Sequence, residues 1–448
     1  MSLLIIAMAI AAFLAILQFP VSGLVKFVLV AIEMVLVSKY LVKRYKLSSE
    51  FGLILLKSRH GIALIERLAK LEKQFNFMAD TGSTMMYGLL SVVMMRKNAS
   101  LPSVIAGFVC LILVSTFVAP VALSFLIMVM KTGTIEKSAA INGGDGLGIV
   151  MLAILLLGGL FLFIISGIVM YGAVVLAALG KTIFFGTNAI AATSAGGTFL
   201  LPGINLPLLE GVIALAIVMA LHEGAHAILA RIARVPVLSS GIVLFGIIPV
   251  GAFVEPDEKR LERTERGKQT RVLVAGPSAN LFASMMFFLL FMGFYYSTQS
   301  LRETGYLVQS GMAPDTIVYR INGSDVNLVN YTNLSLPKNA SVEFATNFGN
   351  ITKTTNGDGK TGITFVPLTR TGLQARFKVP GMDFIYMILG LALSLNFVVG
   401  AVNILPVPLF DGGRIIDINV KNKTLVKAIS YTMLFFLIIN FVPMLFHA

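Results

Sequence analysis

The sequence is poor in charged residues and cysteine, and each shortage excludes a class of protein. Only 13% of the 448 residues are charged, whereas an average soluble protein carries about 25%. A soluble chain that is 56% hydrophobic would expose more apolar surface than water tolerates. The single cysteine, Cys110, lies in an apolar run and excludes an intrachain disulfide. The composition therefore indicates a polytopic membrane protein.

Eight apolar runs divide the chain. Such runs are typical of helices at membrane depth, and about 18 nearly uncharged residues are enough to cross a bilayer. The fourth run has room for one tilted helix and a re-entrant piece. We therefore expect a polytopic α-helical membrane protein with about eight or nine membrane helices. The runs are Met1–Gln18, Leu24–Val37, Leu101–Met130, Leu147–Leu179, Leu206–Ala230, Val272–Tyr295, Phe384–Val402 and Leu425–Leu445.

The net charge of +13 comes largely from two basic segments, Lys39–Lys97 and Arg231–Arg271. Lysine and arginine crowd the cytoplasmic loops of membrane proteins, and no basic-aromatic module for nucleic acid is visible. We therefore expect no nucleic-acid partner and a cytoplasmic position for both segments. If every run crosses once, however, Lys39–Lys97 falls outside. Either the fourth run crosses twice or the charge rule misleads.

An apolar patch, Gly241–Val254, interrupts the second basic segment. It is too short to span the bilayer as a helix, and it contains Gly246, Pro249 and Gly251. Irregular backbone survives at membrane depth only where protein shields it. The patch therefore predicts a re-entrant hairpin.

The stretch Leu301–Pro380 has the character of a soluble domain. The pieces TIVYRIN, SVEFAT, GITFVP and ARFKV alternate polar and apolar residues between turn residues, which predicts short strands. Its five glycosylation sequons indicate a surface outside the cytoplasm, although a domain merely rich in Asn and Ser would also contain them. The sequons begin at Asn322, Asn330, Asn333, Asn339 and Asn350.

The chain has only four histidines, and two of them lie in His222-Glu223-Gly224-Ala225-His226 near the end of an apolar run. Histidines four residues apart share one face of a helix, so both imidazoles can bind one zinc ion. Glu223 can then reach a water molecule on that metal. The alternative is a pair of helix-end histidines satisfied by backbone or lipid headgroups. His60 and His447 are expected to be ordinary surface residues.

A third ligand is expected because hydrolytic zinc sites use three protein ligands and leave the fourth position to water. The candidate is Asp411, in the segment Asn403–Gly413 after an apolar run. Pro406 and Pro408 end the helix, and Gly412-Gly413 permits a tight turn behind the aspartate. The alternative is an acidic turn that only ends a helix.

Together, HEGAH and the later N-x-x-P-x-P-L-x-D-G-G resemble the site-2 protease family of intramembrane metalloproteases. Val274–Asn280 is similar to the small-residue and Asn motif of the family's intervening helix, and Leu201–Pro207 to archaeal-type members. Phe410 stands where the family usually has Leu. The resemblance covers residues 201–413 and leaves the first two hundred unexplained.

The resemblance implies one zinc ion per chain, bound by His222, His226 and Asp411, with Glu223 as the catalytic general base. It also implies that Asn403 and Asn280 contact the substrate or the developing oxyanion. The expected activity is that of an intramembrane zinc endopeptidase. It would use zinc-activated water to hydrolyse peptide bonds in or near transmembrane segments of membrane-anchored proteins, as in regulated intramembrane proteolysis.

The implied partners are membrane-anchored protein substrates and the lipid bilayer. The zinc site would face the cytoplasm at the cell membrane, with the soluble stretch outside. Three alternatives stay open: a membrane transporter, a catalytically inactive receptor or scaffold, and a membrane zincin of another family.

The soluble stretch resembles a PDZ domain in Gly311–Gly323. It has Pro314-Asp315-Thr316 where Pro-Gly-Asp is usual, and the preceding helix is short. We expect a small β-rich PDZ-like domain inserted between two core helices, without a prediction that it binds peptide termini. The expected segments are 1–98 (membrane hairpin and basic cytoplasmic segment), 99–206 (accessory helices), 207–300 (catalytic helices), 301–381 (PDZ-like domain) and 382–448 (C-terminal helices).

Overall fold

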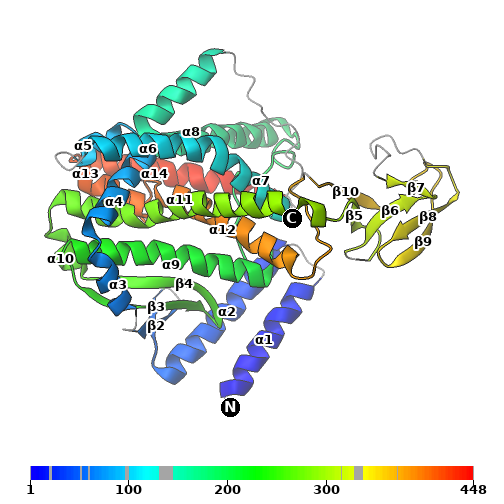
Figure 1. The fold of residues 1–448 in the computed structure, drawn as a ribbon, viewed down its shortest axis with the longest axis horizontal. Coiled ribbons are helices and arrows are strands. Elements are labelled where there is room, and N and C mark those ends of the chain that lie inside the picture. The colour runs from blue at the N-terminus through cyan, green and yellow to red at the C-terminus, as the bar shows by residue number, and fades with distance from the viewer. Residues whose placement is uncertain are drawn as a thin grey trace. The chain divides into compact units, whose positions relative to one another are not determined.

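Two units make up the chain in its computed structural model (Figure 1). The helical unit consists of residues 1–288 and 388–448, and the inserted unit consists of residues 289–387. The expected domain at 301–381 falls within the inserted unit. The residues that the structure describes are 2–19, 23–50, 53–58, 61–95, 100–130, 145–313, 315–326, 336–370 and 372–446.

Helices dominate the helical unit, and α11 and α12 continue from it into the inserted unit. A π-helical turn, Val114–Val118, joins α6 to α7 without a break. The helices are α1 (Ser2–Gln18), α2 (Gly23–Tyr45), α3 (Ile62–Ala69), α4 (Glu72–Tyr87), α5 (Leu90–Met95), α6 (Leu101–Leu113), α7 (Ala119–Met130), α8 (Asp145–Phe185), α9 (Leu208–Ile232), α10 (Glu258–Glu262), α11 (Arg266–Ser297), α12 (Met382–Asn403), α13 (Asp411–Asn419) and α14 (Lys423–Phe441).

Six spans in the described residues are long and apolar enough to cross a membrane, fewer than the eight or nine helices expected. They correspond to the last six apolar runs. The first two runs are also helical, but α1 has only 17 residues and α2 carries Lys26, Glu33 and Lys39. The protein is therefore a multi-pass membrane protein. The spans are 101–130, 149–185, 208–232, 266–297, 382–403 and 423–446.

The fourth run forms one helix, α8, that is broken at Gly159. Gly159 has a positive φ of 61°, as does Gly88 (54°) just after α4. The two glycines lie back to back, and a Cβ on either would overlap the backbone of the other segment. The amide of Leu89 donates to the carbonyl of Leu156 across the contact, at 3.0 Å. The break thus lets α4 and α8 cross at backbone contact.

The patch Gly241–Val254 forms a β-hairpin, which confirms the expected hairpin, while its re-entrant position in the membrane stays a prediction. Its strands, β3 (Val237–Phe245) and β4 (Ile248–Pro256), pair antiparallel. The basic segment before α3 adds β1 (Ser48–Glu50) and β2 (Leu53–Ser58), which the sequence did not predict. The resulting sheet has the order β1-β2-β3-β4, so β4 is an edge strand within the described residues.

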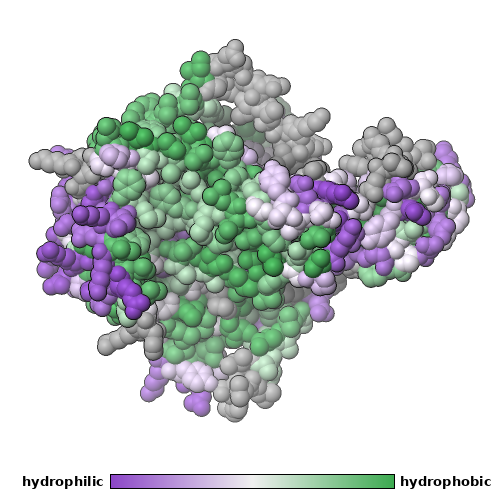
Figure 2. All heavy atoms as spheres, in the orientation of Figure 1, coloured by the Kyte–Doolittle hydropathy of each residue, from purple (hydrophilic) through white to green (hydrophobic). Residues whose placement is uncertain are grey.

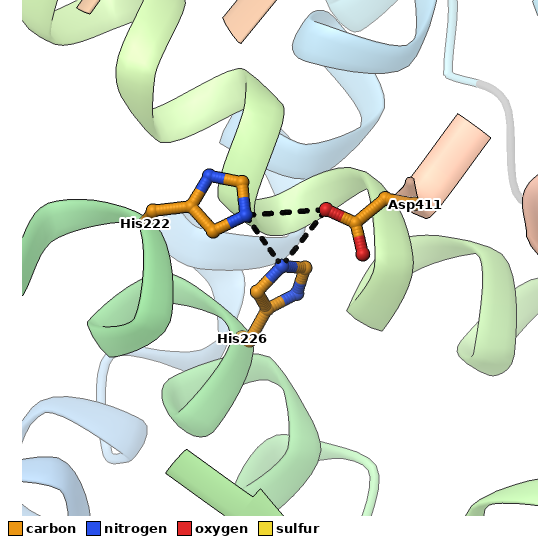
Figure 3. Close-up of side chains that lie close together, drawn as sticks. All are labelled: His222, His226 and Asp411. Carbon is orange, nitrogen blue, oxygen red and sulfur yellow. Dashed lines mark hydrogen bonds and ion pairs between the residues drawn. The ribbon is translucent and has the colours of Figure 1, made fainter. Parts of the chain in front are cut away.

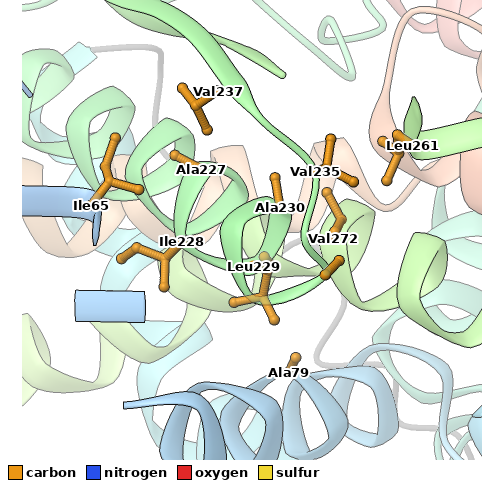
Figure 4. Packing of buried hydrophobic residues seen from close by; sticks show 12 residues of the cluster. Ile65, Ala79, Ala227, Ile228, Leu229, Ala230, Val235, Val237, Leu261 and Val272 are labelled. Atoms are coloured by element: carbon orange, nitrogen blue, oxygen red, sulfur yellow. The ribbon is translucent and has the colours of Figure 1, made fainter. Parts of the chain in front are cut away.

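The core around the second half of α9 joins this helix to five other elements (Figure 4). Ala227, Ile228, Leu229 and Ala230 of α9 pack with residues of α3, α4, β3, α10 and α11. Ala79 on α4 lies beside them, and the residues that follow it to the end of this helix, 80–87, are all buried. The second half of α4 therefore belongs to the packed interior although its sequence is largely polar, whereas Phe77 and Met78 just before it are exposed.

Helix α11 packs closely on both α4 and α12. A Cβ at Gly82 of α4 would overlap the Ser278 hydroxyl. A Cβ at Gly400 of α12 would lie 3.1 Å from the Pro277 carbonyl oxygen. Small residues at such positions let helices approach to backbone contact. They fix α11 between these two helices.

Hydrophobic side chains cover most of the visible face of the helical unit (Figure 2). They belong to lipid-length helices with many exposed large apolar residues, including Ile105, Val109 and Ile112 on α6. Hydrophilic residues gather at the end of this unit where α10 and α3 lie. Such a band with a polar end is the surface expected of a protein embedded in a bilayer.

The inserted unit contains a six-stranded antiparallel sheet. Its order is β10-β5-β6-β8-β9, with β7 paired to β6. TIVYRIN, SVEFAT and GITFVP correspond to β6, β8 and β10, whereas ARFKV contributes only an isolated bridge between Phe377 and Arg302. In the described part of 302–381 there is no α-helix. The strands are β5 (Gly305–Ser310), β6 (Ile317–Ile321), β7 (Ser324–Asp325), β8 (Ser341–Thr346), β9 (Gly349–Thr354) and β10 (Thr364–Leu368).

Three of the five sequon asparagines, Asn322, Asn339 and Asn350, are exposed. The main-chain amide of Glu343 donates to the side-chain oxygen of Asn322, and the side-chain amide of Asn350 donates to the Glu343 carboxylate. Asn330 and Asn333 lie outside the described residues.

A fully buried arginine, Arg302, stands inside the inserted unit. Its guanidinium lies 4.1 Å from the centroid of the Tyr295 ring and also contacts the rings of Phe377 and Tyr386. It donates to the main-chain carbonyls of Arg370, Gly372 and Tyr295 at 3.0–3.1 Å. Aromatic faces and carbonyl oxygens together compensate for the lost hydration of the cation.

Candidate metal centre

The two histidines of HEGAH lie in the last turns of α9 and point toward Asp411 (Figure 3). The Nε2 atoms of His222 and His226 are 3.2 Å apart. Each is also 3.2 Å from Oδ2 of Asp411. The three ligand atoms are therefore close enough together to hold one metal ion. The structure brings together all three residues expected to be zinc ligands.

Asp411 is the first residue of α13, after an irregular segment that follows α12. Gly412 and Gly413 begin this helix rather than forming a turn. A Cβ on Gly412 would overlap the Ile404 carbonyl, and one on Gly413 would overlap the Val407 carbonyl. The glycines therefore let α13 start directly against the segment before it, which aims the aspartate at the histidines.

The charge of Asp411 is fixed by its surroundings. Burial by itself would raise the pKa of the carboxyl, but the imidazoles of His226 and His222 hold that pKa well below its ordinary value. The group is consequently an ionised carboxylate, which is the form that binds metal.

Helix α11 forms the wall behind both imidazoles, with contacts from three residues spaced four apart. The carbonyl of Val272 accepts a hydrogen bond from Nδ1 of His226, at 2.7 Å. Gly276 has no side chain, and a Cβ there would overlap the Nε2 atoms of both rings. The amide of Asn280 lies 3.0 Å from Nδ1 of His222. One helical stripe therefore orients both histidines.

The hydrogen bonds fit a metal-binding tautomer. Because the Val272 carbonyl only accepts, His226 carries a proton on Nδ1, which leaves Nε2 as the nitrogen that a metal would bind. The buried Oδ1 of Asn280 has no partner, while its Nδ2 faces His222. Exchanging the two amide atoms gives that oxygen a donor, Nδ1–H of His222, and frees the second Nε2 lone pair. Metal-bound histidines are usually oriented in this way.

The spacing of the donors also fits zinc. Ligand atoms about 2.1 Å from a tetrahedral zinc ion lie roughly 3.4 Å from one another. The three distances of 3.2 Å are close to that value. Two histidines and one carboxylate also leave a fourth position open, as in catalytic zinc sites.

The site opens into a pocket of about 280 Å³. Glu223 and Asn403 line it, whereas Asn280 does not. Oε2 of Glu223 accepts a 3.3 Å hydrogen bond from the amide of Val254 on β4. An ion pair of 2.6 Å joins Glu258 to Arg414, which also line the pocket. The pocket therefore combines the ligand atoms, a carboxylate and an edge strand.

The sequence predicted the histidines, Glu223 and Asp411 but none of the contacts from Val272, Gly276 and Val254. Two of these contacts use main-chain atoms and the third depends on a missing side chain. The only available signal was the four-residue spacing of Gly276 and Asn280 inside the small-residue motif. His60 and His447 lie outside the described residues.

Comparison with known proteins bears on this geometry. A model of peptidase family M50 matches residues 210–440, more than half of the chain. The chain belongs to peptidase family M50. Members of such a family are expected to use a metal. The match spans α9 and α13, which hold the candidate ligands, and α11, which contacts the two histidines.

An uncharacterized protein of Methanocaldococcus jannaschii is 29% identical over 198 residues. The aligned region covers 43% of this chain and 50% of that relative. The chain thus spans about half the length of the curated relative that it matches. The first two hundred residues lie outside the family match.

Proposed function

We propose that this protein is an intramembrane zinc endopeptidase that cleaves membrane-anchored proteins in or near their transmembrane segments. The observation that carries the proposal is the convergence of His222, His226 and Asp411, with Glu223 beside them on the pocket wall. Membership of the M50 peptidases and the six candidate spans support it.

Zinc bound at this site would polarise the peptide carbonyl and lower the pKa of water. Glu223 is the proposed general base. It lies next to His222 in the chain and faces the pocket, where it would take the proton of the attacking water and pass it to the leaving amine. Asn403, also on the pocket wall, is the candidate for contact with the substrate or the oxyanion. For Asn280, the contact with His222 favours an orienting role.

The substrate would bind as an extended strand. The amide of Val254 donates to Glu223 of α9, so the edge of β4 that pairs with no strand among the described residues borders the catalytic pocket. Edge strands bind extended peptides by adding a strand. A transmembrane helix must unwind to adopt this form, which favours cleavage close to the membrane surface. The exposed side chain of Leu409 on the pocket rim is a further candidate for substrate contact.

The inserted unit is proposed to be a PDZ-like β-module. Its antiparallel sheet supports that assignment, but its described part offers no α-helix to line a peptide groove. Recognition of peptide termini is therefore not part of the proposal.

The proposed activity is tested with Glu223→Gln. The full-length variant in detergent should keep about one zinc per chain, whereas cleavage of a membrane-anchored substrate should fall by at least ~100-fold. Glu210→Gln, in the first turn of the same helix, is the matched control and should cleave normally. Proteomics comparing cells with wild type and Glu223→Gln would supply the substrates. Undiminished cleavage by Glu223→Gln would contradict the assigned base. A wild type without metal would contradict the function.

The zinc site is proposed to face the cytoplasm, with the inserted unit outside. The support is the basic segment beyond HEGAH and the exposed sequon asparagines. Cysteines at Ser324 and Glu265, in a Cys110→Ser background, can be labelled with a membrane-impermeant maleimide. Both positions are exposed, whereas the neighbouring Gln269 is buried. Position 324 should label in intact cells, and position 265 only after lysis. The reverse pattern would invert the topology.

A further inference from the structure

Three successive residues near the start of α11 are held by three different elements. The Gln269 side chain donates to the carbonyls of Glu262 and Thr264, at 3.0 and 2.8 Å. The Thr270 hydroxyl accepts from Asn419, at the end of α13, at 3.0 Å. Arg271 reaches in a third direction, to α4. These contacts immediately precede Val272, whose carbonyl orients His226.

The contact of Arg271 is a two-pronged ion pair with Asp80. Nε donates to Oδ1 at 2.7 Å, and an Nη atom donates to Oδ2 at 2.6 Å. The Asp80 side chain is 6% exposed and that of Arg271 is 18% exposed. Planar contacts of this kind are geometrically specific and strong. Buried ion pairs also leave a costly unpaired charge when one partner is removed.

The surroundings make this pair a rigid link. Ala79, the neighbour of Asp80, packs with Leu229 and Val272 in the core beneath the site (Figure 4). Gly82 brings α4 to within contact of Ser278, two residues past Gly276. The helix α4 therefore supports the stripe of α11 that faces the imidazoles.

We propose that Asp80 is a positioning residue of the metal centre and acts through Arg271 and the main chain of Val272. It would do so in two ways. It holds the turn of α11 whose carbonyl fixes the tautomer and direction of His226. It also neutralises a guanidinium one residue away from that contact, so that a bound dication does not face an uncompensated positive charge. Asp80 precedes the family match, so this link joins an element particular to the N-terminal half to the catalytic helices.

The inference rests on the metal site of the proposed function, and its test uses zinc and cobalt rather than peptide cleavage. Full-length protein in detergent is titrated with zinc against a competing chelator, and the visible spectrum of its cobalt-substituted form is recorded. Asp80→Asn should weaken zinc binding by about 10- to 100-fold, the usual effect of losing a contact that orients a ligand. Its cobalt spectrum should change, because the direction of His226 changes.

The matched control is Glu66→Gln. Glu66 on α3 pairs with Arg231 on α9 at 3.0 Å, but both side chains are substantially exposed. An exposed pair contributes little, so zinc affinity and the cobalt spectrum should equal those of wild type. A merely stabilising role of Asp80 would lower the unfolding temperature of the metal-free protein and leave the spectrum of the folded cobalt form unchanged.

Folded Asp80→Asn with wild-type zinc affinity and cobalt spectrum would overturn the inference while leaving the proposed function intact. If Asp80→Asn does not fold, Arg271→Lys decides. It keeps the charge but loses the two-pronged contact. Weaker zinc binding with an altered spectrum supports the link, and wild-type values for both overturn it. Absence of metal from the wild type would instead contradict the proposed function.

Discussion

Two buried polar centres of this protein are built in opposite ways. In the inserted unit, Arg302 is a cation that the chain itself supplies, and three carbonyls and three aromatic rings surround it. In the helical unit, one ligand atom each of His222, His226 and Asp411 converge, and among the described residues no lysine or arginine pairs with this aspartate. Acceptors that converge without their own donor indicate a ligand, whereas a cation matched by its acceptors indicates a structural role.

The strongest way to break this comparison is to remove an acceptor from the metal centre. Replacing His222, His226 or Asp411 with Ala should reduce zinc from about one ion per chain to none and abolish cleavage, since the site has only three protein ligands. Metal content of purified protein measured by mass spectrometry checks this. An Asp411→Ala protein that keeps its full zinc and activity would remove the aspartate from the ligand set.

Adding one methyl group beside the two histidines should also weaken zinc binding strongly. Gly276→Ala adds one methyl group where the Nε2 atoms of both histidines lie, so it should weaken zinc binding by roughly 10- to 100-fold or more. Helix propensity cannot be the cause of a loss, because Ala is the better helix former.

Gly224→Ala is the matched control for this change. Gly224 lies between the two histidines in sequence, but a Cβ there meets no other atom within 4 Å. Chelator titration should therefore give the wild-type zinc affinity for this variant. Equal affinities for all three proteins would mean that the imidazoles do not bind metal against α11.

Removing the buried cation of the inserted unit, Arg302, tests the other half of the comparison. Arg302→Met leaves three carbonyls without their donor, at a cost of roughly 1–3 kcal/mol each. It should make the inserted unit more sensitive to protease and heat, while the zinc content stays at that of wild type. The exposed Arg320 of the same unit provides the control, and Arg320→Met should alter neither property. Loss of zinc in Arg302→Met would show that the two centres are not independent.

The candidate metal-binding residues could be predicted because their chemistry restricts both residue type and spacing. His222 and His226 must lie four residues apart on one helix, and the third ligand must be another metal-binding side chain. The contacts behind them were not predictable in the same way. Val272 acts through its carbonyl, which every residue has, and Gly276 acts by lacking a side chain.

Parts of the fold could not be predicted from the sequence, for related reasons. The second half of helix α4 contains Asp80, Thr81, Gly82 and Ser83, so neither hydropathy nor charge marks it as buried. It is buried because small residues let it approach α11 and α6, a property that depends on the facing helix. Arg302 likewise resembles any surface arginine of a polar segment until Tyr295 and Phe377 surround it.

The close approach of the two imidazoles to Gly276 also provides a test for other sequences. A protein can keep HEGAH and the distant aspartate and still carry a side chain at the position of Gly276. The motif would then supply all three ligands, but the added side chain would occupy the space where the Nε2 atoms of the two histidines lie. Sequences chosen by the motif alone could therefore fall into two groups, those whose ligands have room to converge and those in which a side chain keeps them apart. The residue four positions before the asparagine of the small-residue motif separates the two groups.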